Sequence, residues 1–238
     1  MTSGQDTRLR ASDGEYFNVY LTGAAESRRP GILVFSPIFG VDGDIKTLAD
    51  RWAARGYLVA APDYFFRVAP GVLDRSEAGR KLGFERWEKL DVDRTIEGLK
   101  TLANFVRSHP CCNGALGALG YCAGGELAFL AGSRLGAEAV ATFHGTRIDR
   151  HLGEANRIKG RLTLHFGGND PLVPTDQVDA IRSGLADHAH ADIHVYDGAG
   201  HGFSFVGRPS YHEGAARGSD GRAQEVFASL NSALASAP

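Results

Sequence analysis

Short apolar runs alternate with amphipathic stretches along most of the chain, and this alternation predicts an α/β fold. The runs have the length and branched residues of strands buried on both faces, and the stretches between them have the apolar spacing of amphipathic helices. Expected strands cover residues 31–36, 57–61, 115–120, 139–143, 161–166 and 192–196. Expected helices cover residues 44–55, 84–108, 126–135, 175–188 and 223–234, the fourth with Thr175 as its N-cap. Because strands that alternate with helices are joined by right-handed crossovers, we expect a mostly parallel central sheet with helices on both faces.

The N-terminal segment has a different pattern. Two β-rich stretches, 7–9 and 16–21, flank the turn signal Ser12-Asp13-Gly14. This arrangement predicts a β-hairpin within residues 1–30 that extends the sheet. No internal repeat or long linker divides the rest of the sequence, and 238 residues suit one α/β domain. We therefore expect a single domain over residues 1–238.

Composition and charge exclude several classes of function. Hydrophobic residues make up 43% of the chain and charged residues 23%, which is enough apolar material for a large core. The net charge is −2, and no basic stripe indicates a nucleic-acid or anionic membrane partner. The N-terminal MTSGQDTRLR has no apolar stretch of a secretory signal, and no segment reaches the roughly 18 apolar residues of a membrane span. We therefore expect a cytoplasmic protein without a nucleic-acid or membrane partner.

The three cysteines divide into a pair and a single residue. Cys111 and Cys112 are adjacent in an expected turn beside Pro110 and Asn113, and an odd, small number of cysteines does not indicate a disulfide framework. We interpret the pair as ordinary turn residues, with a vicinal disulfide or a metal site as the alternative. No CxxC or HxxxH spacing supports a metal, so we expect none.

Cys122 lies in the strongest chemical motif of the sequence. Gly120-Tyr121-Cys122-Ala123-Gly124 has the G-x-nucleophile-x-G form of a nucleophile elbow, directly after an expected strand. Small flanking residues let strand and helix approach closely, and the N–H groups of the following helix favour a thiolate. The N–H of Ala123 can also donate to an oxyanion. The alternative is a glycine-rich turn that holds a buried, inert cysteine.

Two further residues complete the set that a nucleophile elbow needs. Asp170, in Gly168-Asn169-Asp170-Pro171, and His201, in Gly200-His201-Gly202, each follow an expected strand. The order nucleophile, acid, histidine is that of α/β-hydrolases, and such residues gather at the carboxyl ends of parallel strands. A turn aspartate that caps the next helix is the alternative for Asp170. A second oxyanion donor is expected at Ile38, since Pro37 has no N–H.

These segments together resemble the dienelactone hydrolase (carboxymethylenebutenolidase) family. The resemblance runs from about residue 31 to 205 and is carried, in the family's order, by Ile38-Phe39-Gly40, Ala61-Pro62-Asp63-Tyr64, Asn113-Gly114, Gly120 to Gly125, Gly168-Asn169-Asp170 and Ala199-Gly200-His201-Gly202-Phe203. The resemblance implies a single α/β-hydrolase domain that needs no cofactor. It also implies the hydrolysis of a small-molecule lactone, since the family converts dienelactone to maleylacetate.

The resemblance assigns roles to individual positions. It implies Cys122 as nucleophile, His201 as base and Asp170 as acid, with Arg80 binding a substrate carboxylate and Phe84 beside that arginine, where the family usually has tyrosine. His144 falls where the family often has an aromatic residue near the pocket, and substrate contact and a structural role are both open for it.

Two positions depart from the family. Pro37 replaces a glutamate that helps generate the thiolate, and Ser204-Phe205-Val206 replaces a second carboxylate-binding arginine, with Arg208 slightly beyond. We therefore predict a Cys-His-Asp hydrolase of lactones or activated esters and leave open whether dienelactone itself is its substrate. The alternative is a catalytically weak protein of the same fold that binds a ligand or senses oxidants through Cys122. A monomer and a homodimer both fit the sequence.

Overall fold

The computed structural model describes residues 4–232, and the chain forms two compact units, Met1–Leu116 and Gly117–Pro238. Each unit is described by itself. Their strands and helices alternate as the sequence pattern predicts, except that two helices replace one predicted helix, several helix ends differ and one additional 3-10 helix is present.

The first unit begins with a hairpin and continues into parallel strands. Strands β1 (Gln5–Arg10) and β2 (Tyr16–Thr22) pair antiparallel through a turn in which Gly14 has a φ of 92°. Strand β2 pairs antiparallel with β4 (Leu58–Pro62), and β4 pairs parallel with β3 (Arg29–Phe35). Their order in the sheet is therefore β1-β2-β4-β3. Strand β3 precedes β4 in the sequence, but β4 is the one that lies next to the hairpin strand β2.

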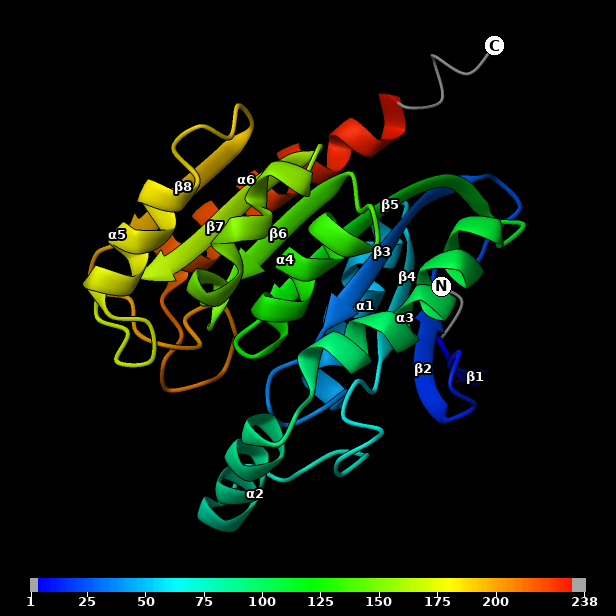
Figure 1. Ribbon diagram of the computed structural model, residues 1–238, viewed down its shortest axis with the longest axis horizontal. Coiled ribbons are helices and arrows are strands. Elements are labelled where there is room, and N and C mark those ends of the chain that lie inside the picture. The colour runs from blue at the N-terminus through cyan, green and yellow to red at the C-terminus, as the bar shows by residue number, and fades with distance from the viewer. Residues whose placement is uncertain (1–3, 233–238) are drawn as a thin grey trace. The chain divides into compact units, whose positions relative to one another are not determined.

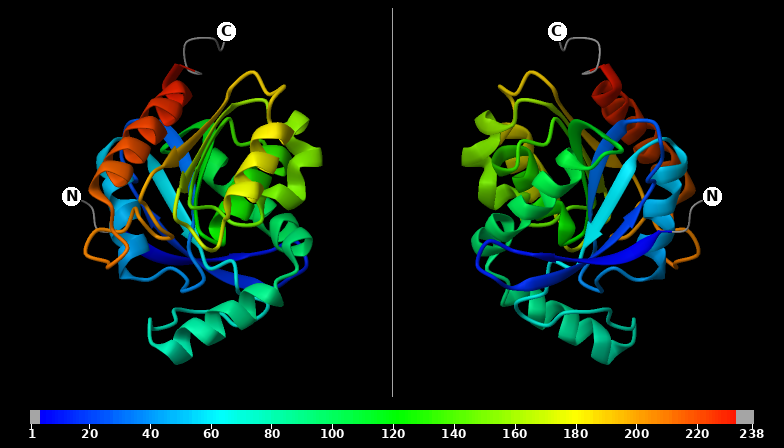
Figure 2. Two further views of the ribbon diagram at one scale, coloured as in Figure 1. Left: turned by 90° about the vertical axis from the view of Figure 1, so that its left-hand side faces the viewer. Right: turned by 90° about the vertical axis from the view of Figure 1, so that its right-hand side faces the viewer.

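Two helices of the first unit cover its strands, and a third extends from them. Helix α1 (Gly43–Ala54) packs on β4 with its apolar side, Ile45, Leu48, Ala49 and Trp52. Helix α3 (Val92–Ser108) lies on the opposite face of the same strands (Figure 2). Helix α2 (Glu77–Glu88) projects away from the strands of its unit (Figure 1).

The predicted helix over residues 84–108 is wrong, because the chain forms α2 and α3 there in place of one helix. The N–H of Lys89 donates to the Glu85 carbonyl and closes the last turn of α2. The Asp91 side chain then accepts from the N–H of Arg94 at 2.9 Å and caps the start of α3. An aspartate that satisfies a free N–H in this way begins a new helix, and the apolar spacing alone does not reveal it.

The second unit contains the parallel strands that carry the candidate site. Strands β5 (Cys112–Tyr121, from Gly117 in this unit), β6 (Ala139–Phe143), β7 (Arg161–Gly167) and β8 (Ala191–Tyr196) pair parallel in this order. Helices α4 (Gly124–Arg134) and α5 (Thr175–Gly184) cover one face, and α6 (Glu213–Ser232) covers the other (Figures 1 and 2). All the carboxyl ends of these strands therefore meet at one edge.

Three predictions about helix ends in the second unit are wrong. Pro174, not Thr175, is the N-cap of α5, and no side-chain hydrogen bond caps that helix, which ends at Gly184 instead of residue 188. Helix α6 begins at Glu213, ten residues before the predicted start at 223. Its first turns contain Gly214, Gly218 and Gly221 and no large apolar side chain, so periodicity is absent there. The 3-10 helix η1 (Ile148–Arg157), which packs on α4 and α5, was not predicted.

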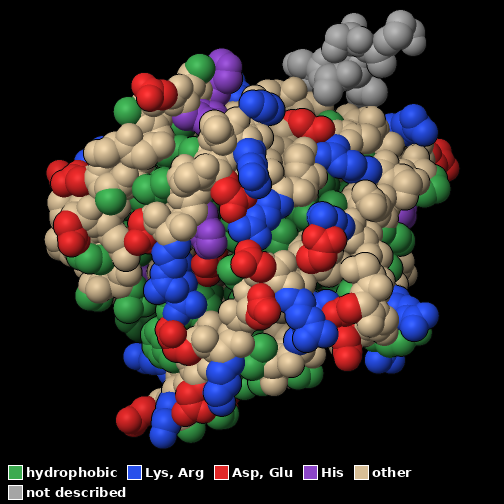
Figure 3. Space-filling view, in the orientation of Figure 1, with side chains coloured by type: hydrophobic (Ala, Val, Ile, Leu, Met, Phe, Trp, Pro, Cys, Tyr) green, Lys and Arg blue, Asp and Glu red, His purple; other side chains and the backbone are tan. Residues whose placement is uncertain are grey.

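No helix within residues 4–232 is long and apolar enough to cross a membrane. Acidic and basic side chains are interspersed over the face drawn in Figure 3. Cys111 and Cys112 are both free thiols.

Candidate active site

The three candidate catalytic residues lie at one edge of the second unit. Cys122 follows β5, Asp170 follows β7 and His201 follows β8, so each stands just beyond the carboxyl end of a parallel strand. In open α/β sheets this is the edge at which functional residues collect. The strand register therefore brings together residues that are 48 and 31 positions apart in the sequence (170 − 122 and 201 − 170).

The turn around Cys122 has the strained geometry of a nucleophile elbow. Cys122 has a φ of 53°, in the left-handed region that side chains other than glycine rarely adopt. Its N–H donates to the Phe143 carbonyl at 3.1 Å, and its carbonyl accepts from the N–H groups of Gly125 at 2.9 Å and Thr146 at 3.1 Å. These three hydrogen bonds hold the strained residue in place, and the strain presents the thiol at the edge of the sheet.

Glycines around the elbow allow close approach of backbone to backbone. A Cβ added to Gly120 would lie 2.2 Å from the carbonyl oxygen of Gly124, and one added to Gly125 would lie 2.4 Å from the Cα of Gly145. Both distances are far below van der Waals contact, so only glycine fits at these positions. Helix α4 begins directly after the nucleophile with Ala123 as its N-cap and no side-chain hydrogen bond at that position. No side chain of the N-cap therefore covers the start of this helix, where N–H groups favour an anion.

Asp170 and His201 form a direct hydrogen bond. The distance between Asp170 Oδ2 and His201 Nδ1 is 2.8 Å, and the carboxylate side chain is fully buried. The other oxygen, Oδ1, accepts from the N–H of Leu172 at 2.8 Å. The N–H of Asn169 also donates to the Ala199 carbonyl at 2.9 Å, which joins the loop after β7 to the loop after β8. The aspartate thereby fixes one tautomer of the imidazole, with its Nδ1 proton toward the carboxylate.

The environment of His201 favours its charged form. Burial acts to lower its pKa, but the charge of Cys122, hydrogen bonding to Asp170 and Cys122, and the charge of Asp170 together raise it from 6.5 to about 10. Because Nδ1 of His201 is bonded to Asp170, the interaction with Cys122 that raises the pKa falls to Nε2.

His144, whose role the sequence leaves open, also lies at this edge. It is completely buried after β6, and its ring packs against the ring of His201 with centroids 4.7 Å apart. By contrast, His165 and His194 lie within β7 and β8 with stacked rings, as expected for structural histidines. Among residues 4–232, no group of three or more His, Cys, Asp or Glu side chains is arranged to hold a metal ion.

The remaining predicted site residues belong to the first unit. Ile38 lies on the loop after β3 and is buried, whereas Arg80 is exposed on α2. Phe84, one turn further along α2, is half-buried, and its ring centroid is 6.1 Å from that of Trp87. Ile38 is thus a fixed part of its unit, and Arg80 is a surface residue of it.

Sequence reasoning missed Arg86, which organises the Ile38 loop. Its guanidinium is buried and donates to the carbonyl of Ile38 at 2.6 and 3.0 Å, and to those of Ala69 and Gly71 at 2.9 and 2.8 Å. It also stacks on Phe65 at 4.0 Å. The buried positions of α2 are 79, 83, 86 and 87, which is ordinary helical spacing, so a buried face through Arg86 could have been found once α2 was separated from α3.

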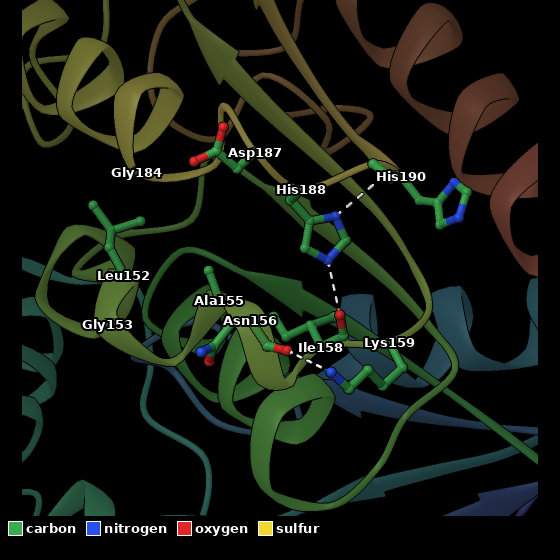
Figure 4. Close-up of a pocket in the computed structure, with 11 residues that line it drawn as sticks. Leu152, Gly153, Ala155, Asn156, Ile158, Lys159, Gly184, Asp187, His188 and His190 are labelled. Carbon is green, nitrogen blue, oxygen red and sulfur yellow. Dashed lines mark hydrogen bonds between the residues drawn. The ribbon is translucent and has the colours of Figure 1, made fainter.

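The second unit also contains a pocket away from the candidate triad. Its volume is about 520 Å³, and its lining comes from η1 and from the segments that precede β7 and β8 (Figure 4). His188 stands in it with both ring nitrogens occupied, one by the Ile158 carbonyl at 2.9 Å and one by the N–H of His190 at 3.3 Å. Asp170 and His201 follow these same strands, so the pocket lies at the amino ends of β7 and β8 and is separate from the candidate site.

The fold and the arrangement of this edge define the class of protein as an α/β-hydrolase. A Klebsiella pneumoniae protein provisionally assigned as a dienelactone hydrolase has the same fold, with a TM-score of 0.82 and 25% identity over 95% of this chain and 99% of its own. The phosphotriesterase P91 from metagenomic libraries, described as dienelactone hydrolase-like, shares the fold with a TM-score of 0.77 at 22% identity, covering 96% of this chain and 99% of its own.

Sequence comparison places the chain within this class. The Dienelactone hydrolase family matches residues 17–230, and the chain belongs to that family. The carboxymethylenebutenolidase of Pseudomonas putida is 28% identical over 226 residues, which cover 94% of this chain and 96% of the relative. That of Pseudomonas sp. strain P51 is also 28% identical, over 92% of each chain. The predicted family and fold class are thus confirmed, and the protein is a carboxylic ester or lactone hydrolase.

Proposed function

We propose that this protein hydrolyses small-molecule lactones or activated esters through a covalent thioester on Cys122, with His201 as base and Asp170 as its orienting acid. The observation that carries the proposal is the 2.8 Å hydrogen bond between Asp170 and His201 at the edge that also bears the strained Cys122. The order of the three residues and their places after parallel strands support the same assignment.

The chemistry begins with a thiolate–imidazolium pair. The pKa of His201, raised to about 10, supports a protonated imidazole at neutral pH, and the proposed nucleophile is the thiolate of Cys122. Sγ of Cys122 attacks the carbonyl carbon, and the electrons of the C=O bond move to its oxygen. The N–H groups of Ala123 and Ile38 are the proposed donors to this oxyanion. Because Pro37 supplies no carboxylate, the helix end and His201 carry the activation of the thiol.

The intermediate then collapses in the forward direction. The C–O bond to the leaving group breaks, and the departing alkoxide or enolate takes the proton of His201. In a lactone this oxygen stays attached to the acyl chain. Water that His201 deprotonates attacks the thioester, the C–S bond breaks, and the acid leaves with Sγ restored. A thiolate is a better leaving group than an alkoxide, so activated esters and enol lactones are the favoured substrates. No step uses a cofactor.

The test is turnover of activated substrates by variants at the nucleophile. We expect the wild type to hydrolyse p-nitrophenyl acetate with an initial burst, and Cys122→Ala to lose at least about 1,000-fold in kcat/KM. Mass spectrometry of the quenched wild-type reaction is expected to detect an acyl group on Cys122. Full activity of Cys122→Ala refutes the nucleophile. Stoichiometric acylation without turnover contradicts hydrolysis and supports a ligand-binding or redox-sensing protein.

The location and assembly of the protein stay predictions. A cytoplasmic hydrolase that acts as a monomer or homodimer is the form we propose, without a nucleic-acid partner. The mixed surface charge and the net charge of −2 are in keeping with a small-molecule substrate.

A further inference from the structure

His144 combines a strained backbone with complete burial beside the candidate base. Its φ is 43°, and among the described residues only Cys122 and Arg147 are other non-glycine residues with positive φ. A side chain other than glycine pays a conformational cost in this region, and burying a polar ring adds to that cost. Its position is therefore maintained by surrounding contacts.

The contacts of His144 join three parts of the candidate site. Its N–H donates to the His165 carbonyl on β7 at 2.7 Å, and its Nε2 lies 3.2 Å from Oγ of Ser204 on the loop after β8. Its ring meets that of His201 at an interplanar angle of 64°, with centroids 4.7 Å apart. The ring of His144 also packs against the aromatic rings of Tyr121, Phe203 and Phe205.

We propose that His144 is a positioning residue that holds the imidazole of His201 in the orientation that faces Cys122. This inference rests on the proposed function. The edge-to-face contact restricts rotation of the His201 ring, while Asp170 holds its Nδ1. The hydrogen bond between His144 and Ser204 ties the loop that carries His201 to the end of β6. His144 acts through His201 and has no contact with a reacting atom in this mechanism.

The charges around His144 are compatible with this role. The titratable residues in contact with it are Tyr121 on β5, His165 on β7 and His201 on the loop after β8. Burial, and then the charge of His201, lower the pKa of His144 well below its ordinary 6.5, and burial with the charges of His194 and Arg222 lowers that of His165 to about 3. Both are neutral at neutral pH, so neither repels the His201 imidazolium.

The test compares variants that separate the ring from its nitrogen atoms. His144→Ala removes the ring, His144→Phe keeps a ring but loses the hydrogen bond to Ser204, and Ser204→Ala removes only that hydrogen bond. His188→Ala, in the pocket at the other ends of the strands, is the matched histidine control. The first readout is the rate of Cys122 alkylation by iodoacetamide from pH 5 to 9, corrected for Cys111 and Cys112 by peptide mass spectrometry.

We expect His144→Ala to lower the alkylation rate of Cys122 at pH 6 and kcat for p-nitrophenyl acetate by about 10- to 100-fold each, since misplacement of a reacting group by about 1 Å costs this much. In this variant the fall of the alkylation rate at low pH is expected to begin at a higher pH than in the wild type. KM for p-nitrophenyl acetate should change little. His144→Phe, which keeps a ring against His201, and Ser204→Ala, which removes only the hydrogen bond, should each lose less in both rates than His144→Ala, and His188→Ala should match the wild type.

Three results overturn the inference. The first is unchanged alkylation and kcat in His144→Ala. The second is a fall in melting temperature of His144→Ala while the alkylation profile of the folded protein keeps its shape and magnitude, which indicates a purely structural residue. The third is an equal loss in His188→Ala. Alkylation does not require ester turnover, so a wild type that alkylates at low pH without hydrolysing esters would refute the proposed function and leave the inference about His144 standing.

Discussion

At the scale of single residues, the candidate site depends on unusual states of ordinary side chains. Cys122 is strained, His144 is strained and buried, and His201 is hydrogen-bonded to a buried carboxylate. None of these states follows from residue type. Each is imposed by neighbours that the fold supplies, and the titration of His201 is the most direct way to measure that effect.

We expect the imidazole of His201 to remain protonated at pH 8. Its pKa is raised from an ordinary 6.5 to about 10, so the proton is lost only as the pH rises through the higher value. NMR titration of ¹³C-labelled histidine can follow this directly. In Cys122→Ser the anionic partner is absent, burial opposes the charge, and the pKa should fall. A wild-type His201 that titrates near 6.5 contradicts the thiolate–imidazolium pair.

At the scale of elements, the site depends on close approach between a strand, a helix and a loop. Gly120 meets Gly124 across the elbow, and Gly125 meets Gly145 on the loop after β6. The buried Glu126 on the first turn of α4 pairs with His151 of η1 at 2.8 Å, which fixes the start of the helix. The elbow therefore requires that α4 sits at one particular depth against the sheet.

Gly125→Ala should destabilise the fold by about 1–3 kcal/mol, because the new methyl group would lie 2.4 Å from backbone that has no room to move. Activity of the remaining folded protein should also fall, since α4 carries the N–H of the proposed oxyanion donor. Gly153→Ala is the control, as nothing lies within 4 Å of its Cβ. Urea denaturation measures the free energy of unfolding of both variants. Equal values for the two would show that the elbow tolerates a wider spacing between Gly125 and Gly145.

At the scale of the whole molecule, the family resemblance assigns residues of both units to one reaction. The candidate triad belongs to the second unit, while Ile38, Arg80 and Phe84 belong to the first. In place of the family's second carboxylate-binding arginine, the second unit has Phe205, whose ring lies 5.3 Å from that of Tyr121. Substrate preference is therefore the property that tests what the first unit contributes.

Arg80→Ala should raise KM about tenfold for lactones that carry a carboxylate and leave neutral activated esters unchanged. The loss of one charge-assisted hydrogen bond to a carboxylate weakens binding by about this factor. Lys81→Ala removes the neighbouring exposed cation of α2 and is the matched control. Steady-state kinetics on paired substrates with and without the carboxylate measure the effect. Equal losses on both substrates, or the same loss in Lys81→Ala, would remove Arg80 from the substrate site.

The amino-acid sequence by itself determined the alternation of strands with helices, the α/β class and the three candidate catalytic positions. Apolar periodicity and the glycines around Cys122 are local signals, and the hydrolase order of Cys122, Asp170 and His201 is a property of the chain alone.

Only the tertiary structure decided the break between α2 and α3, the early start of α6, the burial of Arg86 and the contact of His144 with His201. The sequence could have indicated the aspartate cap at Asp91 and the helical spacing of Arg86. Only the structure shows their partners, which are the N–H of Arg94 and the carbonyl of Ile38. Whether His144 touches the base depends on a loop 57 residues away (201 − 144), and periodicity carries no information over that separation. Contacts between distant segments depend on how strands pair and helices pack, and these are decided by burial over the whole core.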